Sequence, residues 1–379
     1  MDFFIQNQIG MQQNQFLSSN LCSENYIYLD ANNLQNKIEY LPILGKELTS
    51  CPNLTSLKMA FEGLQIGDEG LKNLALNLEC QNLSHIELSL RGSNIRKQGL
   101  NYLLQGLVKC PNISNLKINL SGNTIESEGI QNMNNQLSQL KSLTNLTLYL
   151  SNTKIGNEGL SILGQQLAQC QKIENLAIFV SFNQITQQGA QDLCYQLAQC
   201  KTLKNIDIYL RSNDIGSIGM QSIFKQLSQN KDIIKLTLDL SVCNIQDSGY
   251  IDLASSFELF SNLKFLSLQL QGNKIEQQFI NQVVQQMHKF PHLQHLELYL
   301  SDNLINADGF TALAKELKNI QNLNCFGINL RGNSTEYKDL SNFISQLSQC
   351  TQLLVLSINN QLVQKCIKQM HSLIKIEGL

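Results

Sequence analysis

Residues 146–155 read LTLYLSNTKI, in which leucines alternate with other residues and an isoleucine follows a short polar segment. The same frame returns in steps of 30 residues, as LKINLSGNTI from Leu116, IDIYLRSNDI from Ile206, LSLQLQGNKI from Leu266 and LELYLSDNLI from Leu296. Self-similarity at a fixed period of this size is typical of stacked repeats. The sequence therefore predicts one continuous solenoid rather than two or three globular domains.

One repeat, residues 110–139, shows what each unit should form. Leu116, Ile118 and Leu120 alternate with other residues, which predicts a strand with one buried face. Apolar residues at spacings of three and four, beginning at Ile130, predict a helix with one apolar stripe. Neither element buries its apolar side alone, so successive units must stack strand on strand and helix on helix.

Two further positions carry a recurring residue, with exceptions such as Ser93, Thr153 and Cys243 at the first. The turn position carries asparagine in six repeats, at Asn123, Asn183, Asn213, Asn273, Asn303 and Asn333. A buried polar side chain there predicts a structural ladder, because it can bond the backbone of the neighbouring turn. Glycine recurs just before the helical run, as at Gly129 and Gly159, and predicts a tight entry or an unusual dihedral.

The eleven cysteines do not indicate a disulfide framework. Six share one repeat position: Cys51, Cys80, Cys110, Cys170, Cys200 and Cys350. Other repeats place Leu140, Phe260, Phe290 or Ile320 there, so the position is a buried apolar one at which a free cysteine acts as a small hydrophobe. This pattern predicts reduced core thiols in a cytosolic protein.

Composition and motifs exclude several functional classes. The net charge is -2, with 28 basic and 30 acidic residues interspersed, so nucleic acid is not expected as a partner. The start, MDFFIQNQIG, does not resemble a signal peptide, and no run of apolar residues is long enough for a membrane span. No phosphate-binding, zinc-binding or nucleophile motif is present, so we predict no enzyme activity, no metal and no cofactor.

The repeat resembles a known family. The frame Leu143-Thr-Asn-Leu146-Thr-Leu148-Tyr-Leu150, followed by a helix of the form G-x-x-x-L-x-x-x-L, is similar to the leucine-rich repeats of the ribonuclease-inhibitor class. The resemblance covers roughly residues 25 to 375 and implies an α/β horseshoe. A parallel sheet would line its concave face, helices would cover its convex face, and the concave face would bind protein. Two residues more than the usual repeat predict a longer strand and a broader sheet.

The resemblance also sets the expected boundaries. Residues 1–24 are rich in Gln, Asn and Ser and are expected to form a flexible arm or a partial cap. Residues 25–379 are expected to form the solenoid, with an N-terminal cap at 25–50 and a C-terminal cap at about 360–379. No acidic tail follows the last repeat.

The outward strand residues supply the candidate binding site. Tyr149, Phe179 and Tyr209 occupy the middle outward row on consecutive strands, and Asp239 and Tyr299 continue it. The two flanking rows hold Arg91, Arg211 and Arg331 on one side and Asp207 and Glu297 on the other. Arginine beside tyrosine is typical of interface hot spots. The alternative interpretation is that the rings only cover one another and stabilise the sheet.

Three functional hypotheses follow. The leading one is a non-enzymatic scaffold that holds a protein partner on its concave face. The second is a regulator of a small GTPase, because the repeat class is similar to that of the Ran GTPase-activating protein; Arg91, Arg211 or Arg331 would then be the candidate arginine. The third is a subunit of a large cytoskeletal or ciliary assembly, which the Gln and Asn bias suggests.

Overall fold

The computed structural model describes residues 25–30, 41–133, 135–246, 253–333, 337–347, 350, 353 and 355–359. The chain divides into two compact units, residues 1–183 and 184–379. The expected arm at 1–24 and the expected C-terminal cap at about 360–379 lie outside the described residues. The single solenoid over residues 25–379 stays a prediction.

The first unit alternates strands with helices. Its strands are β1 (Tyr26–Asp30), β2 (Ser56–Ala60), β3 (His85–Ser89), β4 (Asn115–Asn119), β5 (Asn145–Tyr149) and β6 (Asn175–Phe179). Its helices are α1 (Leu41–Thr49), α2 (Gly67–Leu76), α3 (Gly99–Leu107), α4 (Glu126–Gln131), α5 (Gln136–Gln139) and α6 (Gly156–Ala168).

The second unit continues the same alternation. Its strands are β7 (Asn205–Tyr209), β8 (Lys235–Asp239), β9 (Phe265–Gln269), β10 (His295–Tyr299), β11 (Cys325–Asn329) and β12 (Val355–Asn359). Its helices are α7 (Gln187–Ala198), α8 (Gly216–Leu227), α9 (Leu253–Phe257), α10 (Gln277–Gln282), the 3₁₀ helix η3 (Val284–Lys289), α11 (Ala307–Leu317) and α12 (Tyr337–Leu347).

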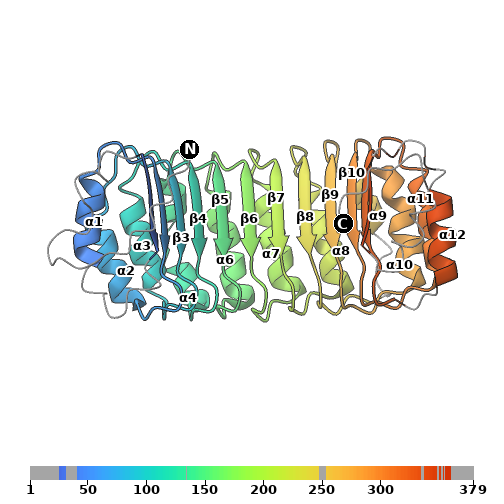
Figure 1. The fold of residues 1–379 in the computed structure, drawn as a ribbon, viewed down its shortest axis with the longest axis horizontal. Helices are drawn as coiled ribbons and strands as arrows, with labels where there is room; N and C mark the ends of the chain where they lie inside the picture. Colours follow the sequence, from blue (N-terminus) through green and yellow to red (C-terminus); the bar gives the residue numbers. More distant parts are fainter. Residues whose placement is uncertain are drawn as a thin grey trace. The chain divides into compact units, whose positions relative to one another are not determined.

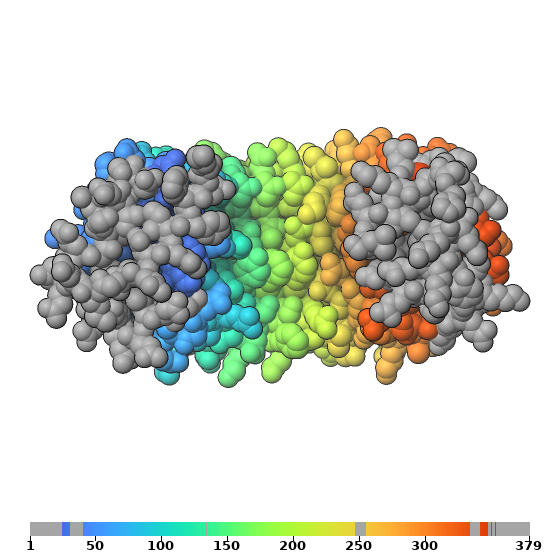
Figure 2. All heavy atoms as spheres, in the orientation of Figure 1, coloured from blue at the N-terminus to red at the C-terminus, as the bar shows by residue number. Residues whose placement is uncertain are grey.

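Within each unit, strands that follow one another in sequence pair in parallel. Leu116 of β4 lies opposite Leu146 of β5, and Leu236 of β8 lies opposite Leu266 of β9. In each unit the strands form one layer and the helices a second (Figure 1). A space-filling view shows the repeats of each unit as successive bands in chain order (Figure 2). The core lies between the layers, where alternate strand residues such as Leu146 and Leu148 are buried.

The strands are five residues long, and their backbone pairing continues beyond them. The amide of Leu150 donates to the carbonyl of Phe179 at 2.7 Å, and that of Asn152 donates to Ser181 at 2.8 Å. The inter-repeat hydrogen bonding therefore reaches beyond the regular strand to Asn152, and a strand longer than that of the usual repeat stays a prediction.

The predicted asparagine ladder is present in both units. In the first, the buried Asn183 amide donates to the carbonyls of Leu150 at 2.7 Å and Val180 at 3.0 Å, and its oxygen accepts from Thr153 N at 2.9 Å. In the second, Asn273 makes the corresponding bonds to the turn before it. Each such side chain joins two successive turns and satisfies backbone groups that no strand partner reaches.

The glycine that recurs near the helix start does not serve to provide an unusual backbone dihedral. Gly159 lies inside the first turn of α6 and has no positive φ. A Cβ atom there would lie 2.9 Å from Ile155 Cβ and 3.1 Å from Ser127 Cα of the preceding repeat. The position therefore needs glycine for close approach between repeats, which confirms the tight entry and corrects the dihedral interpretation.

One predicted helix is interrupted. The apolar stripe that begins at Ile130 predicts a single helix, but α4 ends at Gln131 and α5 begins at Gln136. Asn135 adopts φ 61°, a left-handed conformation that asparagine tolerates better than most residues. The buried stripe survives the break because Met133 and Leu137 remain in the core.

The cysteine row is buried, as predicted. The structure describes nine cysteines, all free thiols, and eight of them are buried. Cys325, on β11, is half-buried. Burial raises the pKa of Cys200 to about 11 and is the main cause that raises the pKa of Cys243 to about 12.

The ladder predicts a large stability loss on Asn183→Ala. The substitution removes the bonds that Asn183 makes with the buried Thr153 N, Ile155 N and Val180 O, whereas Leu150 O keeps the Thr153 hydroxyl, so we expect the free energy of unfolding to fall by about 3 kcal/mol. Denaturant titration would measure this loss. Asn132→Ala is the matched control, because this more exposed amide makes one bond, to Lys97 O, and its removal should cost under about 1 kcal/mol. Equal losses in both variants would contradict the ladder.

The thiol environments predict selective alkylation. Only the thiolate reacts, so Cys200 and Cys243 should stay almost unlabelled by iodoacetamide at pH 8 while Cys325 reacts first among the described cysteines. Since both pKa values lie well above pH 9, their labelling rates should rise about tenfold per pH unit between pH 7 and 9. Peptide mass spectrometry would measure the rates, with guanidinium-unfolded protein as the control.

Candidate functional site

Each strand presents alternate side chains on the side of the sheet away from the core, such as Thr147 and Tyr149 in β5. We call this side the open face. The parallel register brings equivalent residues of neighbouring strands side by side, as it does for Asn119, Tyr149 and Phe179. Neighbouring strands lie about 4.8 Å apart, so side chains in one row touch when they are large.

Tyr149 and Phe179 form a stacked pair on the open face of the first unit. Their ring centroids lie 4.2 Å apart at an interplanar angle of 12°. The ammonium group of Lys117 lies 5.8 Å from the Tyr149 centroid. Both rings are half-buried rather than fully exposed, because each covers one face of the other. Tyr209 lies in β7 of the second unit, so a continuous strip of three rings stays a prediction.

Charged residues on the same face are linked in a chain. Glu87 lies 3.3 Å from the ammonium of Lys58 and 3.0 Å from that of Lys117. Partial burial is the largest single influence on the Glu87 carboxylate and raises its pKa, but the bonds and charges of the two lysines outweigh it and hold the pKa below its usual value. Lys58 also lies 5.5 Å from the Tyr28 centroid. These pairs join neighbouring strands of the open face.

Phe182 is a candidate binding residue that lies outside the three outward rows predicted from the sequence. It follows β6 in the turn, has 58% of its surface exposed and adopts φ 58°. Other repeats place Gly92, Gly122, Asn152 or Ser212 at this position, which suit a positive φ. A bulky apolar side chain at a turn position of this kind is the signal that would have found it. Val242 repeats the exception in the second unit, with φ 54° and 45% exposure.

The open face of the second unit holds a second cluster. Lys235 lies 3.0 Å from Asp207 and 5.4 Å from the centroid of the Phe265 ring. Phe265 stacks on His295 with centroids 4.5 Å apart. His295 Nε2 lies 3.1 Å from Glu297 Oε1. Lys235, Phe265 and His295 come from consecutive strands, and each precedes the leucine at the second position of its strand. This position forms a further outward row, and the sequence would have revealed the cluster had that row been considered.

Two predicted site residues, Asp239 and Asp207, occupy less open positions than expected. Asp239 is buried, with 8% of its surface exposed, and its carboxylate accepts from Ser241 N at 2.9 Å. It lies in register between Tyr209 and Gln269, whose longer side chains flank it. Asp207 pairs with Lys235 rather than completing a patch around Tyr209. Their contribution to binding stays a prediction.

Tyr299 belongs to the cluster around Glu297. Burial, and then the charge and hydrogen bond of Glu297, raise the pKa of the tyrosine hydroxyl. The hydroxyl therefore stays protonated at neutral pH and serves as a hydrogen-bond donor to the carboxylate.

The arginines of the third outward row remain available. Arg91, Arg211 and Arg331 are exposed, and none of them forms an ion pair with another residue in the described ranges. They lie two residues beyond the ends of β3, β7 and β11. A role as the arginine of a GTPase regulator stays a prediction.

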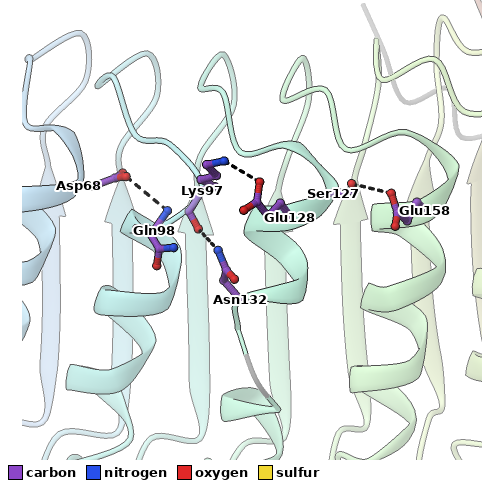
Figure 3. A network of polar contacts seen from close by, with 7 residues as sticks. All are labelled: Asp68, Lys97, Gln98, Ser127, Glu128, Asn132 and Glu158. Carbon is purple, nitrogen blue, oxygen red and sulfur yellow. Dashed lines mark hydrogen bonds and ion pairs between the residues drawn. The ribbon is translucent and has the colours of Figure 1, made fainter.

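A polar network on the helical side of the first unit is structural (Figure 3). Lys97 pairs with Glu128 at 2.6 Å, and Ser127 donates to Glu158 at 2.8 Å (Figure 3). Asp68 accepts from Gln98 N at 3.3 Å (Figure 3). Each contact joins one repeat to the next, so these carboxylates are engaged in holding neighbouring helix starts together.

Neither a metal site nor a membrane-spanning helix is found in the part of the chain that the structure describes. No group of three or more His, Cys, Asp or Glu in those ranges is arranged to hold a metal ion. No helix in them combines the length and the apolar character needed to cross a bilayer.

Comparison with known proteins agrees with the repeat geometry. A model of the family described as leucine-rich repeat matches residues 142–164, which include β5 and the start of α6. The fold is a leucine-rich-repeat solenoid. The ribonuclease-inhibitor-like class stays a prediction. Proteins built on leucine-rich repeats are typically interaction modules and are generally not enzymes. No curated protein gives a significant match to this chain.

Solved structures that resemble this chain share little sequence with it. Internalin C2 of Listeria monocytogenes is 18% identical, over 68% of this chain and 84% of its own, with a TM-score of 0.36. A chain of the yeast Rad7 and Elc1 complex is 16% identical, over 90% and 78%, with a TM-score of 0.48. A chain of the TLR13–ssRNA13 complex is 20% identical, over 82% and 40%, with a TM-score of 0.44.

Proposed function

We propose that this protein is a non-enzymatic scaffold that binds a protein partner on the open face of its sheet. The stacked pair of Tyr149 and Phe179 is the observation that carries the proposal. Two half-buried rings fixed against each other present aromatic area with little side-chain entropy left to lose. Rigid aromatic anchors of this kind supply a large part of the binding energy in protein interfaces.

The conformation of Phe182 supports the same surface. A non-glycine residue in the left-handed region costs about 1 kcal/mol or more, and here the cost is incurred for a side chain that is mostly exposed. Folding gains little from an exposed phenylalanine in this conformation. Contact with a partner gives a reason for it, because Phe182 follows the strand that ends at Phe179 and adds apolar area beside the pair.

The remaining predicted residues extend the proposed surface. Tyr209, Asp207 and Arg211 belong to the open face and its edge in the second unit, as do Asp239, Glu297, Tyr299 and Arg331, and Arg91 belongs to the edge in the first. Buried reduced thiols support a reducing compartment such as the cytoplasm. Membership of a cytoskeletal or ciliary assembly is the broader alternative, in which the helices also make contacts.

The first test is recovery of the tagged chain from its own cells, beside the Tyr149→Ala/Phe179→Ala/Tyr209→Ala variant. We expect a stoichiometric partner that the variant loses, because the substitutions remove the aromatic anchors while the core is unchanged. Quantitative mass spectrometry would measure the recovery, and circular dichroism would verify the fold.

Tyr195→Ala is the matched control for this test. Its ring is 53% exposed and lies on α7 in the helical layer, so the control should keep the partner. Retention of the same partner by the folded triple variant would contradict the proposal. A large set of proteins that is indifferent to the triple variant but reduced in the control would favour an assembly subunit held by its helices.

A second prediction separates stability from binding at Phe182. Phe182→Gly removes the left-handed strain, so the free energy of unfolding should rise by about 1 kcal/mol. The same variant should recover less of the partner, because it removes exposed aromatic area. Denaturant titration and quantitative recovery would measure the two effects. Lower stability together with unchanged recovery would show that Phe182 serves the fold instead.

A further inference from the structure

The second unit presents a row of three stacked groups on its open face. Lys235 of β8, Phe265 of β9 and His295 of β10 occupy equivalent positions on consecutive strands. The Lys235 ammonium lies 5.4 Å from the Phe265 centroid, and the Phe265 and His295 rings stack at 29° with centroids 4.5 Å apart. Lys235 thus covers one end of this aromatic stack. The other end of the row, beyond His295, is Cys325 of β11.

Glu297 lies beside that end of the stack. Its carboxylate is 3.1 Å from His295 Nε2, and its side chain is 26% exposed. Among the described residues, no lysine or arginine pairs with it. A half-buried carboxylate gains substantially from a cation, because solvent screens its charge only in part.

The Glu297 side chain lies close over the neighbouring strand on this side. Glu297 lies opposite Gly327 of β11, and a Cβ atom on Gly327 would lie 3.3 Å from Glu297 Cγ. Gly327 and the small side chain of Cys325 are the β11 residues next to Glu297 and His295. No bulky β11 side chain therefore competes for the flank of the carboxylate or the free end of the stack.

Local pairing, rather than the net charge of this face, leaves Glu297 open to a cation. Asp207, Asp239 and Glu297 are the carboxylates of β7, β8 and β10, Lys235 is the one lysine on those strands, and Arg211 and Arg331 lie two residues beyond the ends of β7 and β11. Lys235 is already paired with Asp207 at 3.0 Å. Glu297 is consequently the carboxylate that is only half-buried and has no lysine or arginine partner among the described residues, since Asp239 is buried and bonded to Ser241 N.

We propose that Glu297 and the His295 ring form a subsite for an arginine side chain. A planar guanidinium can lie over the free end of the aromatic stack and donate to the carboxylate at the same time. A lysine ammonium has no plane to stack and donates as a point charge, so arginine fits better. The Lys235 ammonium over Phe265 shows that this stack already accommodates one cation.

The subsite rests on the proposed function only in that its arginine would belong to a protein partner. Its test uses no partner. The probe is N-acetyl-arginine amide, titrated into the whole protein while ¹H–¹⁵N correlation spectra follow the amides of His295, Glu297 and Gly327. N-acetyl-citrulline amide, a neutral analogue of the same shape, is titrated in parallel.

We expect saturable shifts at these three amides with the arginine probe and none with citrulline. Glu297→Gln should raise the dissociation constant of the arginine probe about tenfold, because it removes the charged hydrogen-bond partner. Glu316→Gln is the matched control, since it makes the same charge change on α11 and should leave the constant unchanged. The lysine analogue should bind more weakly than the arginine probe.

Three results would overturn the subsite: equal binding of arginine and citrulline, an unchanged constant in the folded Glu297→Gln variant, or shifts that never saturate. Any of them leaves the Tyr149 and Phe179 proposal standing, because that proposal is tested by partner recovery. Conversely, saturable arginine binding in the triple alanine variant that loses its partner would establish the two surfaces independently.

Discussion

The asparagine ladder is the interaction on which the rest of the structure depends. Each repeat must turn sharply after its strand, and the turn leaves buried backbone groups without sheet partners. Asn183 donates to carbonyls of its own turn and of the preceding turn and accepts from amides of the preceding turn, so one side chain joins two turns. Where asparagine is replaced, part of the bonding persists: the Cys243 thiol still reaches Leu210 O at 3.2 Å, and the Thr153 hydroxyl reaches Leu150 O.

A fixed frame on the inside leaves the open face free to vary. Alternate strand residues such as Leu146 and Leu148 fill the core and hold the register. The residues between them contact one another across the open face, within a row or between adjacent rows, so they can be changed without disturbing the core. This freedom explains why one surface of the molecule carries stacked rings, ion pairs and a half-buried carboxylate in close succession.

Most of the fold could be predicted from particular residues. The strand positions, the buried thiols at Cys110 and Cys200 and the asparagine ladder are confirmed, because each depends on a local period that stacking repeats thirty residues later. The sequence-based interpretation was wrong at single residues whose local geometry differs from what the repeat pattern indicates. Asn135 broke the helix by adopting a positive φ, and Gly159 proved necessary for close approach rather than for its dihedral.

The sequence by itself determined which side of the sheet each residue occupies, since alternation assigns faces without reference to any neighbour. It also placed Tyr149 and Phe179 in one row. Only the tertiary structure decided which groups meet and how much water reaches them. It paired Asp207 with Lys235, buried Asp239 between longer side chains and set His295 against Glu297. These outcomes depend on side-chain length and contacts across neighbouring strands, which a one-dimensional period does not encode.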